Sequence, residues 1–368
     1  MILKNTTIQK FFQIVKDSSF VCFGASKMPQ ELCEWYTEFE FQKKIRFIAD
    51  NDKTKWHTDK EIQGYNIPVI SPAEFVENTN ENEVILITSR YYYDIIEQLQ
   101  SIKKLERNVC YVFPLMELEH SRFEVTKRTS QMIIPKKIHY CWFGGGAKPK
   151  LNQACIDSWK KYCPDYEIIE WNPQNCDMEI NSYVSEAYHK CKQWGAVSDY
   201  FSVKILYEHG GIYLDTDVQL LKNIDIFLCN QAFASFDSTN GMINFGSGAG
   251  TVPGNMLFKE IQNEYEDLHF LNPDGSRNDA ANYIYQTRII RKYGLRLDNS
   301  KQYLDNISIY PSECFCPYDL RSGKTNMTSN TYGIHQFDGS WWDAERKKVY
   351  SKQQQYSMSI LRRIEENE

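Results

Sequence analysis

Two aspartates one residue apart stand near the middle of the chain, in the segment GGIYLDTDV of residues 210–218. An apolar run leaves a glycine pair and ends on Asp215 and Asp217, and on an extended chain these two side chains point the same way. Carboxylates that close repel each other, so both stay ionised only beside a cation. Hard oxygen ligands at a strand end suit Mg²⁺ or Mn²⁺, which can also bridge a diphosphate.

The same pattern is typical of a second chemistry. Haloacid-dehalogenase phosphatases also place an Asp-x-Asp after an apolar strand, and there the first aspartate, Asp215 here, attacks a phosphate. Such enzymes need a Ser/Thr-ended strand, a lysine and a second acidic cluster further along the chain. The only good strand of that kind, VILITS (84–89), lies upstream, and no Gly-Asp with a following acid comes after Asp217. The order of the motifs therefore disfavours a phosphatase.

The element before the aspartates is predicted to be a buried helix. Residues 195–209 are apolar nearly all round, and the pair Gly210–Gly211 ends the pattern as C-terminal glycines do. Asp199 and Ser202, three residues apart, share one face of this helix. A buried acid needs a partner, so Asp199 is either a hydrogen-bonding core residue or a site residue that meets a ligand hydroxyl.

A predicted strand further upstream delivers an aromatic residue to a flexible loop. In IIPKKIHYCWFGGG (133–146) the apolar positions alternate and lead to Trp142 and three glycines. An aromatic ring beside exposed backbone suits a flat base and its ribose, while the alternative is a core tryptophan followed by a plain loop. Residues 154–172 then predict a helix, a turn at Pro164 and another strand.

The first part of the chain predicts a separate Rossmann-like domain. Apolar strands at 20–26, 44–52, 82–89 and 108–115 alternate with helical segments, which indicates a parallel sheet with helical crossovers. Gly24 and Asp50 resemble the dinucleotide-binding fingerprint, but one glycine stands where three are needed, so we expect no tight NAD binding.

The predicted organisation is α/β throughout, with boundaries read from composition. Residues 116–132 are polar and lack an apolar period, so we expect a domain at 1–125, a second at 126–343 and a C-terminal helix at 344–368. The apolar face of that helix, with Val349, Tyr356, Ile360 and Ile364, either packs on its own domain, the favoured reading, or touches the inner face of a membrane as a peripheral contact.

Composition narrows the class of protein. The 368 residues carry a net charge of −6 and no basic domain stands out, which disfavours nucleic acid as a partner. The 11 cysteines are scattered and odd in number, which predicts reduced thiols in a cytosol. The opening residues lack the apolar core of a signal peptide, and no stretch approaches the roughly 18 apolar residues of a membrane span. We therefore expect a cytoplasmic protein.

Several segments, in their order along the chain, resemble glycosyltransferase family 32. They are IPKKIHYCWFGG, SWKKYCPDYEIIEWN, AVSDY, LYEHGGIYLDTDV, IYPSECFCP and HQFDGSWW, and together they cover about residues 133–342. The resemblance implies a GT-A fold and a retaining transfer of a hexose from a nucleoside-diphosphate sugar, with UDP favoured. It also implies a saccharide or lipid-linked saccharide acceptor, in bacterial surface or capsular polysaccharide synthesis.

The resemblance also implies roles for individual residues. Trp142 would stack on the base, Asp199 and Asp215 would hold the donor sugar and the ribose, and Asp217 would bind Mn²⁺ or Mg²⁺ directly. In the family, a segment like HQFDGSWW closes over the diphosphate. Its His335 can bind a metal, and Ser340 and the Trp341 indole can donate to phosphate oxygens.

The sequence departs from the family at one position. Family members usually carry an arginine three residues after the helix aspartate, and that arginine would contact the donor sugar. This chain has Ser202 at that position, so Ser202 is the expected donor-binding residue there. A donor-binding protein that has lost turnover therefore stays as an alternative. The first 120 residues lie outside the match and resemble Rossmann-like modules that accompany some bacterial surface-sugar enzymes, where they would serve docking or regulation.

Overall fold

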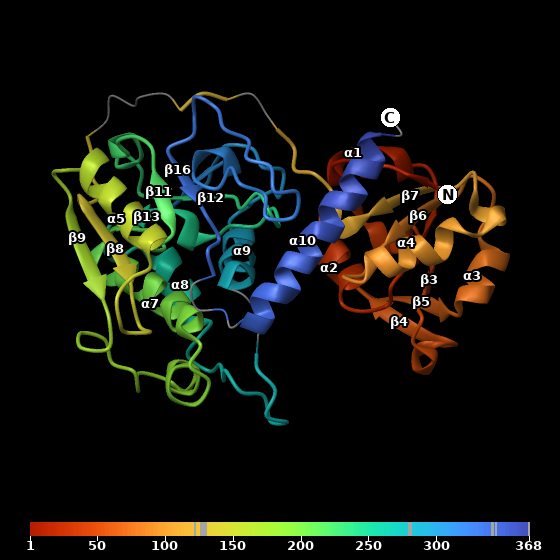
Figure 1. Cartoon of the computed structure of the whole chain (residues 1–368), viewed down its shortest axis with the longest axis horizontal. Helices are drawn as coiled ribbons and strands as arrows, with labels where there is room; N and C mark the ends of the chain where they lie inside the picture. The colour runs from red at the N-terminus through yellow and green to blue at the C-terminus, as the bar shows by residue number, and fades with distance from the viewer. Residues whose placement is uncertain (121–122, 126–130, 279–281, 340–341, 343, 367–368) are drawn as a thin grey trace. The chain divides into compact units, whose positions relative to one another are not determined.

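The computed structural model (Figure 1) describes residues 1–120, 123–125, 131–278, 282–339, 342 and 344–366. The chain forms two compact units, one of Met1–Glu119 with Ser351–Glu368 and the other of His120–Tyr350. We call them the first and the second unit. Both are mixed α/β with sheets rich in parallel pairs, as the alternation of strands and helices predicted. The expected boundaries lay at 125/126 and 343/344.

The first unit is built on a seven-stranded sheet in the order β1-β7-β6-β2-β3-β5-β4. All neighbours are parallel except the hairpin of β4 and β5. The four expected strands are present, and β1 and the hairpin are additional. In chain order the strands are β1 (Ile2–Leu3), β2 (Phe20–Phe23), β3 (Ile45–Ala49), β4 (Thr58–Ile62), β5 (Tyr65–Ile70), β6 (Val84–Ile87) and β7 (Val109–Val112).

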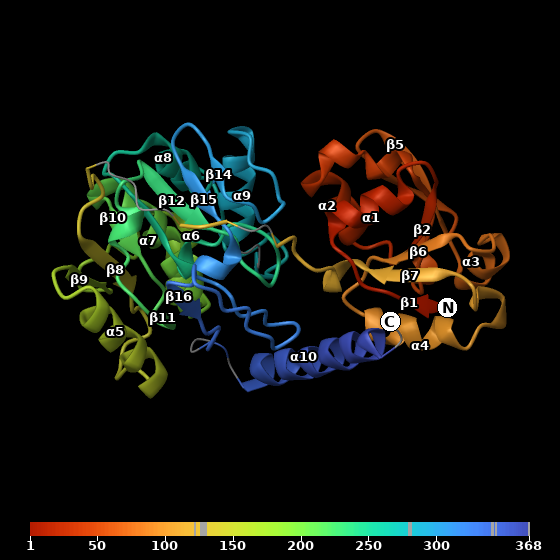
Figure 2. The ribbon, with the colours of Figure 1, turned by 90° about the horizontal axis from the view of Figure 1, so that it is seen from above.

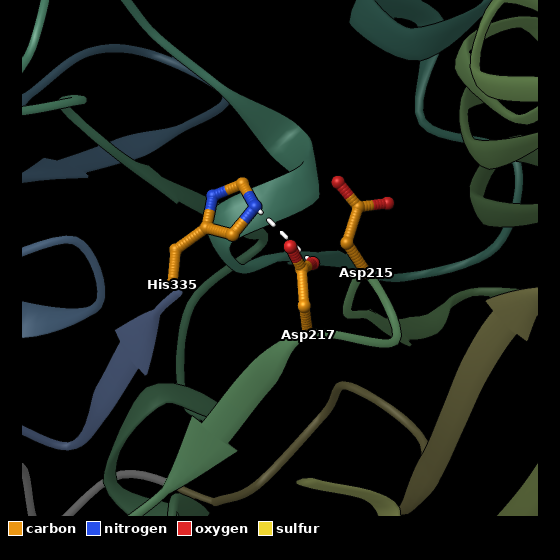
Figure 3. A group of neighbouring side chains, drawn as sticks. All are labelled: Asp215, Asp217 and His335. Carbon is orange, nitrogen blue, oxygen red and sulfur yellow. Dashed lines mark ion pairs between the residues drawn. The ribbon is translucent and has the colours of Figure 1, made fainter. Parts of the chain in front are cut away.

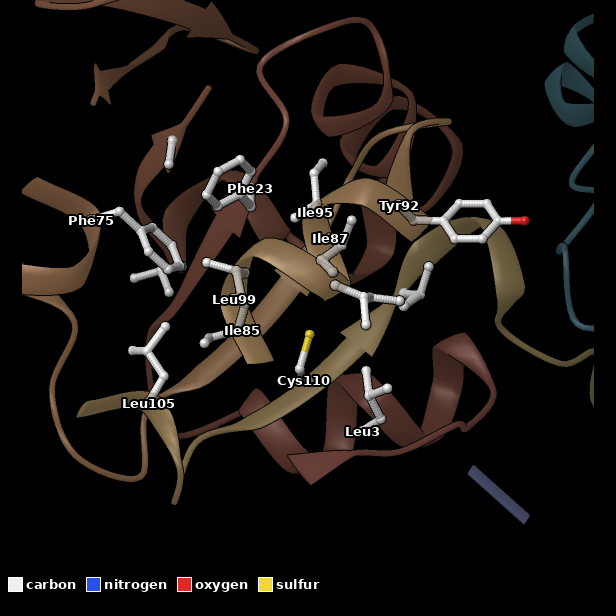
Figure 4. Close-up of a cluster of buried hydrophobic side chains, with 14 of the residues drawn as sticks. Leu3, Phe23, Phe75, Ile85, Ile87, Tyr92, Ile95, Leu99, Leu105 and Cys110 are labelled. Carbon is white, nitrogen blue, oxygen red and sulfur yellow. The ribbon is translucent and has the colours of Figure 1, made fainter. Parts of the chain in front are cut away.

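Helices cover both faces of this sheet, because its strands are apolar on both sides. Figure 2 shows α1 (Ile8–Val15) and α2 (Met28–Trp35) on one side and α4 (Tyr92–Gln100) on the other, which α3 (Pro72–Asn78) also covers. Along β2 the side chains alternate: Val21 and Phe23 enter the cluster under α3 and α4, shown in Figure 4, and Phe20 and Cys22 enter the opposite one.

The last helix, α10 (Ala344–Glu365), completes the core of the first unit. Its residues Ile360 and Ile364 are buried in the same cluster as Phe23 and Leu99, whereas Val349 is 58% exposed. Two of the four residues expected on the apolar face of this helix are thus buried in the core of the first unit. Among the described residues, no helix is both long enough and apolar enough to cross a membrane.

The second unit contains another seven-stranded sheet, in the order β14-β15-β12-β13-β10-β8-β9. Strands β8, β9, β10, β12 and β15 run in one direction, and β13 and β14 run against them. The strands are β8 (Lys137–Cys141), β9 (Glu167–Trp171), β10 (Gly211–Tyr213), β12 (Ala232–Ser235), β13 (Ala249–Thr251), β14 (Gln302–Tyr303) and β15 (Ser308–Tyr310).

Helices and a small second sheet surround these strands. The longer helices are α5 (Lys150–Tyr162), α7 (Trp194–His209), α8 (Met256–Asn263) and α9 (Asn282–Lys292), and α6 (Ser182–Ser185) is a single turn. The small sheet pairs β11 (Val218–Leu220) with β16 (Gly333–His335) in antiparallel register. Helix α7 and the strand after Pro164 match the elements that the sequence predicted.

The glycine pair between α7 and β10 allows the chain to enter the middle of the sheet. Gly210 and Gly211 have φ of +64° and +89°, in the region that favours glycine. A Cβ at Gly211 would lie 2.9 Å from Nε2 of His139 on the neighbouring strand β8. The pair therefore lets the chain turn tightly out of α7, so that β10 delivers the aspartates to the carboxyl edge of the sheet.

Candidate functional site

A cavity of about 660 Å³ opens at the carboxyl edge of the sheet in the second unit. Four carboxylates line it, those of Asp199, Asp215, Asp217 and Asp237, together with His335 and the half-buried Trp142. None of the described lining residues is a lysine or an arginine. The cavity is therefore acidic, and it attracts cations rather than anions.

Strand register explains how these residues meet. Tyr213 at the end of β10 pairs with His139 on β8 and with Ala249 at the start of β13, and Ala249 pairs with Ala234 on β12. The chain segments that leave β8, β10 and β12, and the one that enters β13, thus lie side by side at one edge. They carry, in that order, Trp142, the two aspartates, Asp237 and Ser247.

Asp215, Asp217 and His335 form a compact group, which we call the metal group (Figure 3). One ligand atom from each lies within 4.8 Å of the others, and Nε2 of His335 is 3.3 Å from Oδ1 of Asp217. The pairing of Val218 with His335 between β11 and β16 brings the histidine to the aspartates. Two carboxylates and one imidazole are a set of ligands that could hold a divalent cation.

The segment after His335 wraps around Asp217. The amide of Gln336 donates to the Asp217 carbonyl at 3.0 Å, and the amide of Asp338 donates to its Oδ2 at 2.8 Å. Between them Phe337 has φ of +51°, rare for a bulky residue. Its ring stacks on the His335 imidazole with centroids 4.1 Å apart. The left-handed residue thus lets one short turn hold both an aspartate and the histidine ring.

Further contacts fix the other faces of the metal group. The Ser247 hydroxyl and Nδ1 of His335 lie 2.9 Å apart, which leaves Nε2 directed at the aspartates. The backbone amide of Asp215 donates to the Gly246 carbonyl at 2.9 Å. A methyl group at Gly246 would overlap Oδ2 of Asp215, so this carboxylate sits against bare backbone.

Helix α5 holds the strand that follows the aspartates. The Trp159 indole donates to the Val218 carbonyl at 2.7 Å, and the Ser158 hydroxyl accepts from the Leu220 amide at 2.9 Å. Nearly two turns earlier, Asn152 donates to the hydroxyl of Thr216, between the two aspartates, at 3.0 Å. The sequence predicted a helix over SWKKY and a likeness to the family, and the bonds of Ser158 and Trp159 give that segment a positioning role.

Electrostatics set the group apart from ordinary surface acids. Burial raises the pKa of Asp215 to about 6, with His335 opposing and Asp217 adding to the shift. Burial also acts to raise the pKa of Asp217, but the charge and hydrogen bond of His335 outweigh it and lower that pKa. Burial and the charge of Asp215 raise the pKa of Asp199. A divalent cation would relieve this repulsion between carboxylates.

The other residues expected at the site have different surroundings. Asp199 lines the cavity and accepts from Nδ2 of Asn282 at 2.7 Å. Ser202 is buried, its hydroxyl donates to the Asp199 carbonyl at 2.8 Å, and it does not line the cavity. Trp142 lines the cavity and donates to the Gly146 carbonyl at 3.2 Å. The predicted donors Ser340 and Trp341 lie outside the described residues.

Sequence reasoning missed several lining residues, among them Asp237, Asn244, Trp194 and Asn282. Asp237 had a usable signal, because it follows the largely apolar run AFASF of residues 232–236 just as Asp215 follows an apolar strand. Asn282 and Trp194 begin helices and have no such pattern. Only the folded chain shows that they face the same cavity.

Comparison with known proteins agrees with this geometry. Residues 149–234 match the sequence model of the glycosyltransferase sugar-binding region containing the DXD motif, which spans α5, α7 and both aspartates. An uncharacterized glycosyltransferase of Acanthamoeba polyphaga mimivirus is 29% identical over 229 residues, covering 57% of this chain and 84% of the viral protein. The chain thus contains a DXD sugar-binding region of glycosyltransferases, and these matches support a glycosyltransferase rather than a phosphatase.

Two solved structures show weaker likeness. The PaToxG glycosyltransferase is 17% identical, covers 43% of this chain and 68% of its own, and has a TM-score of 0.32. A glycosyltransferase involved in the glycosylation of the major capsid of PBCV-1 is 12% identical, covers 58% of this chain and 98% of its own, and has a TM-score of 0.31. Both scores are too low to establish a shared fold.

Proposed function

We propose that this protein is a metal-dependent, retaining glycosyltransferase of family 32 with a GT-A fold. It moves a hexose from a nucleoside-diphosphate sugar, UDP-linked, to a saccharide or lipid-linked saccharide acceptor. The observation that carries the proposal is the metal group of Asp215, Asp217 and His335 inside a cavity, with both aspartates within the matched DXD sugar-binding region of residues 149–234.

The charge of the cavity supports the metal dependence. A diphosphate that entered it would face four carboxylates and no lysine or arginine among the described lining residues. Repulsion of that kind prevents binding unless a divalent cation stands between the acids and the phosphates. Asp217 and His335 would hold the ion, with Asp215 beside them, because their ligand atoms already converge.

The surrounding residues would position the donor. Trp142 offers a half-exposed ring for the base at the end of β8, one strand away from the metal group. Asp199 accepts one hydrogen bond from Asn282, and its carboxylate retains capacity to accept sugar hydroxyls. Ser202 supports Asp199 from within the helix through its bond to the backbone carbonyl of that residue.

The chemistry proposed at this site needs no protein base. When bound, the divalent ion stabilises negative charge on the leaving diphosphate. Asp199 and Asp215 hold the sugar and ribose in place, and an acceptor hydroxyl approaches on the face that the diphosphate leaves. The departing phosphate oxygen takes the proton of that hydroxyl, so the new bond keeps the configuration of the old one.

The proposed setting is bacterial surface or capsular polysaccharide synthesis, in the cytoplasm or peripherally at the inner membrane face. The first unit would serve docking or regulation. Its sheet holds its own apolar clusters on both faces, as a domain that folds around its own core does.

A donor screen tests the proposal. The full chain is incubated with UDP-, GDP- and dTDP-hexoses, with Mn²⁺ or with EDTA, and with a mixture of methyl glycosides as acceptors. We expect Mn²⁺-dependent thermal stabilisation by one nucleotide sugar, its hydrolysis, and a transfer product whose NMR coupling constants report retention. Binding without turnover would indicate the donor-binding protein, and release of phosphate from phosphomonoesters would indicate the phosphatase.

A further inference from the structure

Asp237 is a buried carboxylate on the cavity wall that belongs neither to the metal group nor to the Asp199–Asn282 pair. It is 1% exposed, and its carboxylate accepts from the Thr239 amide at 2.7 Å and from Nδ2 of Asn244 at 3.1 Å. No described lysine, arginine or histidine forms an ion pair with it. A carboxylate has about four acceptor sites, so these two neutral donors leave acceptor capacity toward the cavity.

The position of Asp237 along the sheet edge indicates which part of a ligand could donate hydrogen bonds to its carboxylate. Trp142 follows β8, the metal group follows β10, and Asp237 follows β12, with β13 between the last two. The metal group therefore lies between Trp142 and Asp237. A donor with its base on Trp142 and its diphosphate at the metal group extends its sugar away from Trp142, toward the side of Asp237.

The wall around Asp237 is fixed by contacts with a neighbouring loop. The Leu320 amide donates to the Thr239 hydroxyl at 3.1 Å, and the Ser238 hydroxyl donates to the Tyr318 carbonyl at 2.6 Å. Thr239, Asn240 and Leu320 line the cavity beside Asp237. The described residues that line the cavity here offer a carboxylate and no lysine or arginine; the nearby Arg321 donates to the Ser238 carbonyl and does not line the cavity. Such a wall suits a neutral ligand rich in hydroxyl groups better than an anionic one.

We propose that Asp237 is the acceptor of a second hydroxyl-binding subsite, for the saccharide that lies beyond the diphosphate. Asn244 positions it, because its amide nitrogen holds Asp237 while its oxygen accepts from the Gly246 amide at 3.0 Å, next to Asp215. The inference rests on the proposed function. The transferred hexose and the acceptor saccharide present the same hydroxyl chemistry, and the experiment distinguishes them.

The test compares wild-type full chain with Asp237→Asn by calorimetry in Mn²⁺. The ligands are UDP, the UDP-hexose found in the donor screen (or UDP-glucose and UDP-galactose if it finds none), and methyl hexosides added on top of UDP. We expect unchanged UDP affinity. If the subsite holds the transferred hexose, UDP-hexose should bind to Asp237→Asn about tenfold more weakly than to wild type. If the subsite holds the acceptor, a methyl hexoside should instead show that tenfold loss. Asp298→Asn is the matched control, since Asp298 likewise caps a turn through the Ser300 amide, outside the cavity.

Equal sugar affinities in wild type and Asp237→Asn overturn the inference, and so does a wild-type chain that binds none of these sugars. Because binding is measured without turnover, the inference is decided even if the chain transfers no sugar and the proposed function fails. If Asp237→Asn does not fold, Asp237→Glu replaces it. That variant keeps the charge but moves it by one methylene, and the same tenfold loss is expected.

Discussion

The carboxyl edges of the two sheets carry the same three kinds of residue and use them differently. In the first unit, Asp50 accepts from the amides of Ala25 at 2.7 Å and Asp52 at 2.8 Å and pairs with Lys55 at 3.2 Å. In the second, Asp217 has the Asp338 amide and His335, and it lies beside Asp215. Asp50 thus has two amides and a lysine as partners, whereas Asp217 converges with Asp215 and His335 on one point where a cation could bind.

Glycine and tryptophan repeat the contrast. Gly24 has φ of +113°, and a Cβ there would lie 2.6 Å from the Thr88 carbonyl of the next strand, while Gly246 makes room for the Asp215 carboxylate. Trp56 donates its indole N–H to the Asp50 carbonyl, but Trp142 lines a cavity. Residue type at a strand end therefore indicates a site only when its neighbours leave it unsatisfied.

The largest expected difference is between substitutions of Asp217 and of Asp50. Asp217→Asn should lower turnover by about 10³-fold and abolish Mn²⁺-dependent donor binding, because it removes the charge that faces the metal. The fold should remain, as circular dichroism would show. Asp50→Asn should leave turnover unchanged and lower the free energy of unfolding by about 1–3 kcal/mol. Retained Mn²⁺-dependent donor binding in Asp217→Asn would contradict the assignment.

The two glycines should separate metal affinity from stability. In Gly246→Ala the new methyl group displaces the Asp215 carboxylate, so Mn²⁺ affinity measured by calorimetry should fall about 10- to 100-fold. In Gly24→Ala the left-handed backbone and the Thr88 carbonyl should cost about 1–3 kcal/mol of stability, with unchanged Mn²⁺ affinity. Equal Mn²⁺ affinity in Gly246→Ala and wild type would show that Asp215 is not a ligand.

Substitutions of Trp142 and Trp56 should differ by a smaller amount, in their effect on UDP affinity. Trp142→Ala should weaken UDP binding by about 1–3 kcal/mol, the usual range for losing a ring that stacks on a base. Trp56→Ala, the control in the first unit, should not change it. Isothermal titration with UDP and Mn²⁺ measures both. Unchanged UDP affinity in Trp142→Ala would place that ring in the core or on the acceptor side.

The smallest expected signal is that of NAD on the first unit. The Ala25 amide, which a pyrophosphate would need, already donates to Asp50, and the space above Gly24 is filled by Thr88. Calorimetric titration of NAD into the full chain should therefore give no binding in the micromolar range. A micromolar dissociation constant for NAD would show that the carboxyl edge of the first sheet also binds a ligand.

Much of the fold could be predicted because its signals are local. The apolar run of α7, the glycine pair after it and the acids after β10 stand within one short segment, where residue type and order identify them. The hairpin of β4 and β5 escaped prediction. Its strand β4, TDKEI, is an edge strand that is mostly exposed, so it lacks the apolar pattern of an inner strand.

The site could be predicted only in part, because its partners lie far apart in sequence. Asp338 is 121 residues from Asp217, and Ser247 is 88 residues from His335. The family resemblance placed His335 near the aspartates, but no pattern of residues indicates that Phe337 adopts a left-handed backbone to turn the chain around Asp217. The sequence analysis did not propose Asp237 as a site residue, although the apolar strand before it could be recognised.

By itself, the sequence determined which residues end up at strand ends, since alternation and glycine turns depend on near neighbours along the chain. Only the tertiary structure decided what each of those residues does there. Asp50 and Asp217 both follow apolar strands. The amide of Asp52 in its own turn, the amide of Ala25 after β2 and the side chain of Lys55 satisfy Asp50, whereas a histidine from a distant strand meets Asp217. The reason is physical: a carboxylate binds a ligand with the acceptor capacity that its packed neighbours leave unused, and those neighbours come from the whole fold.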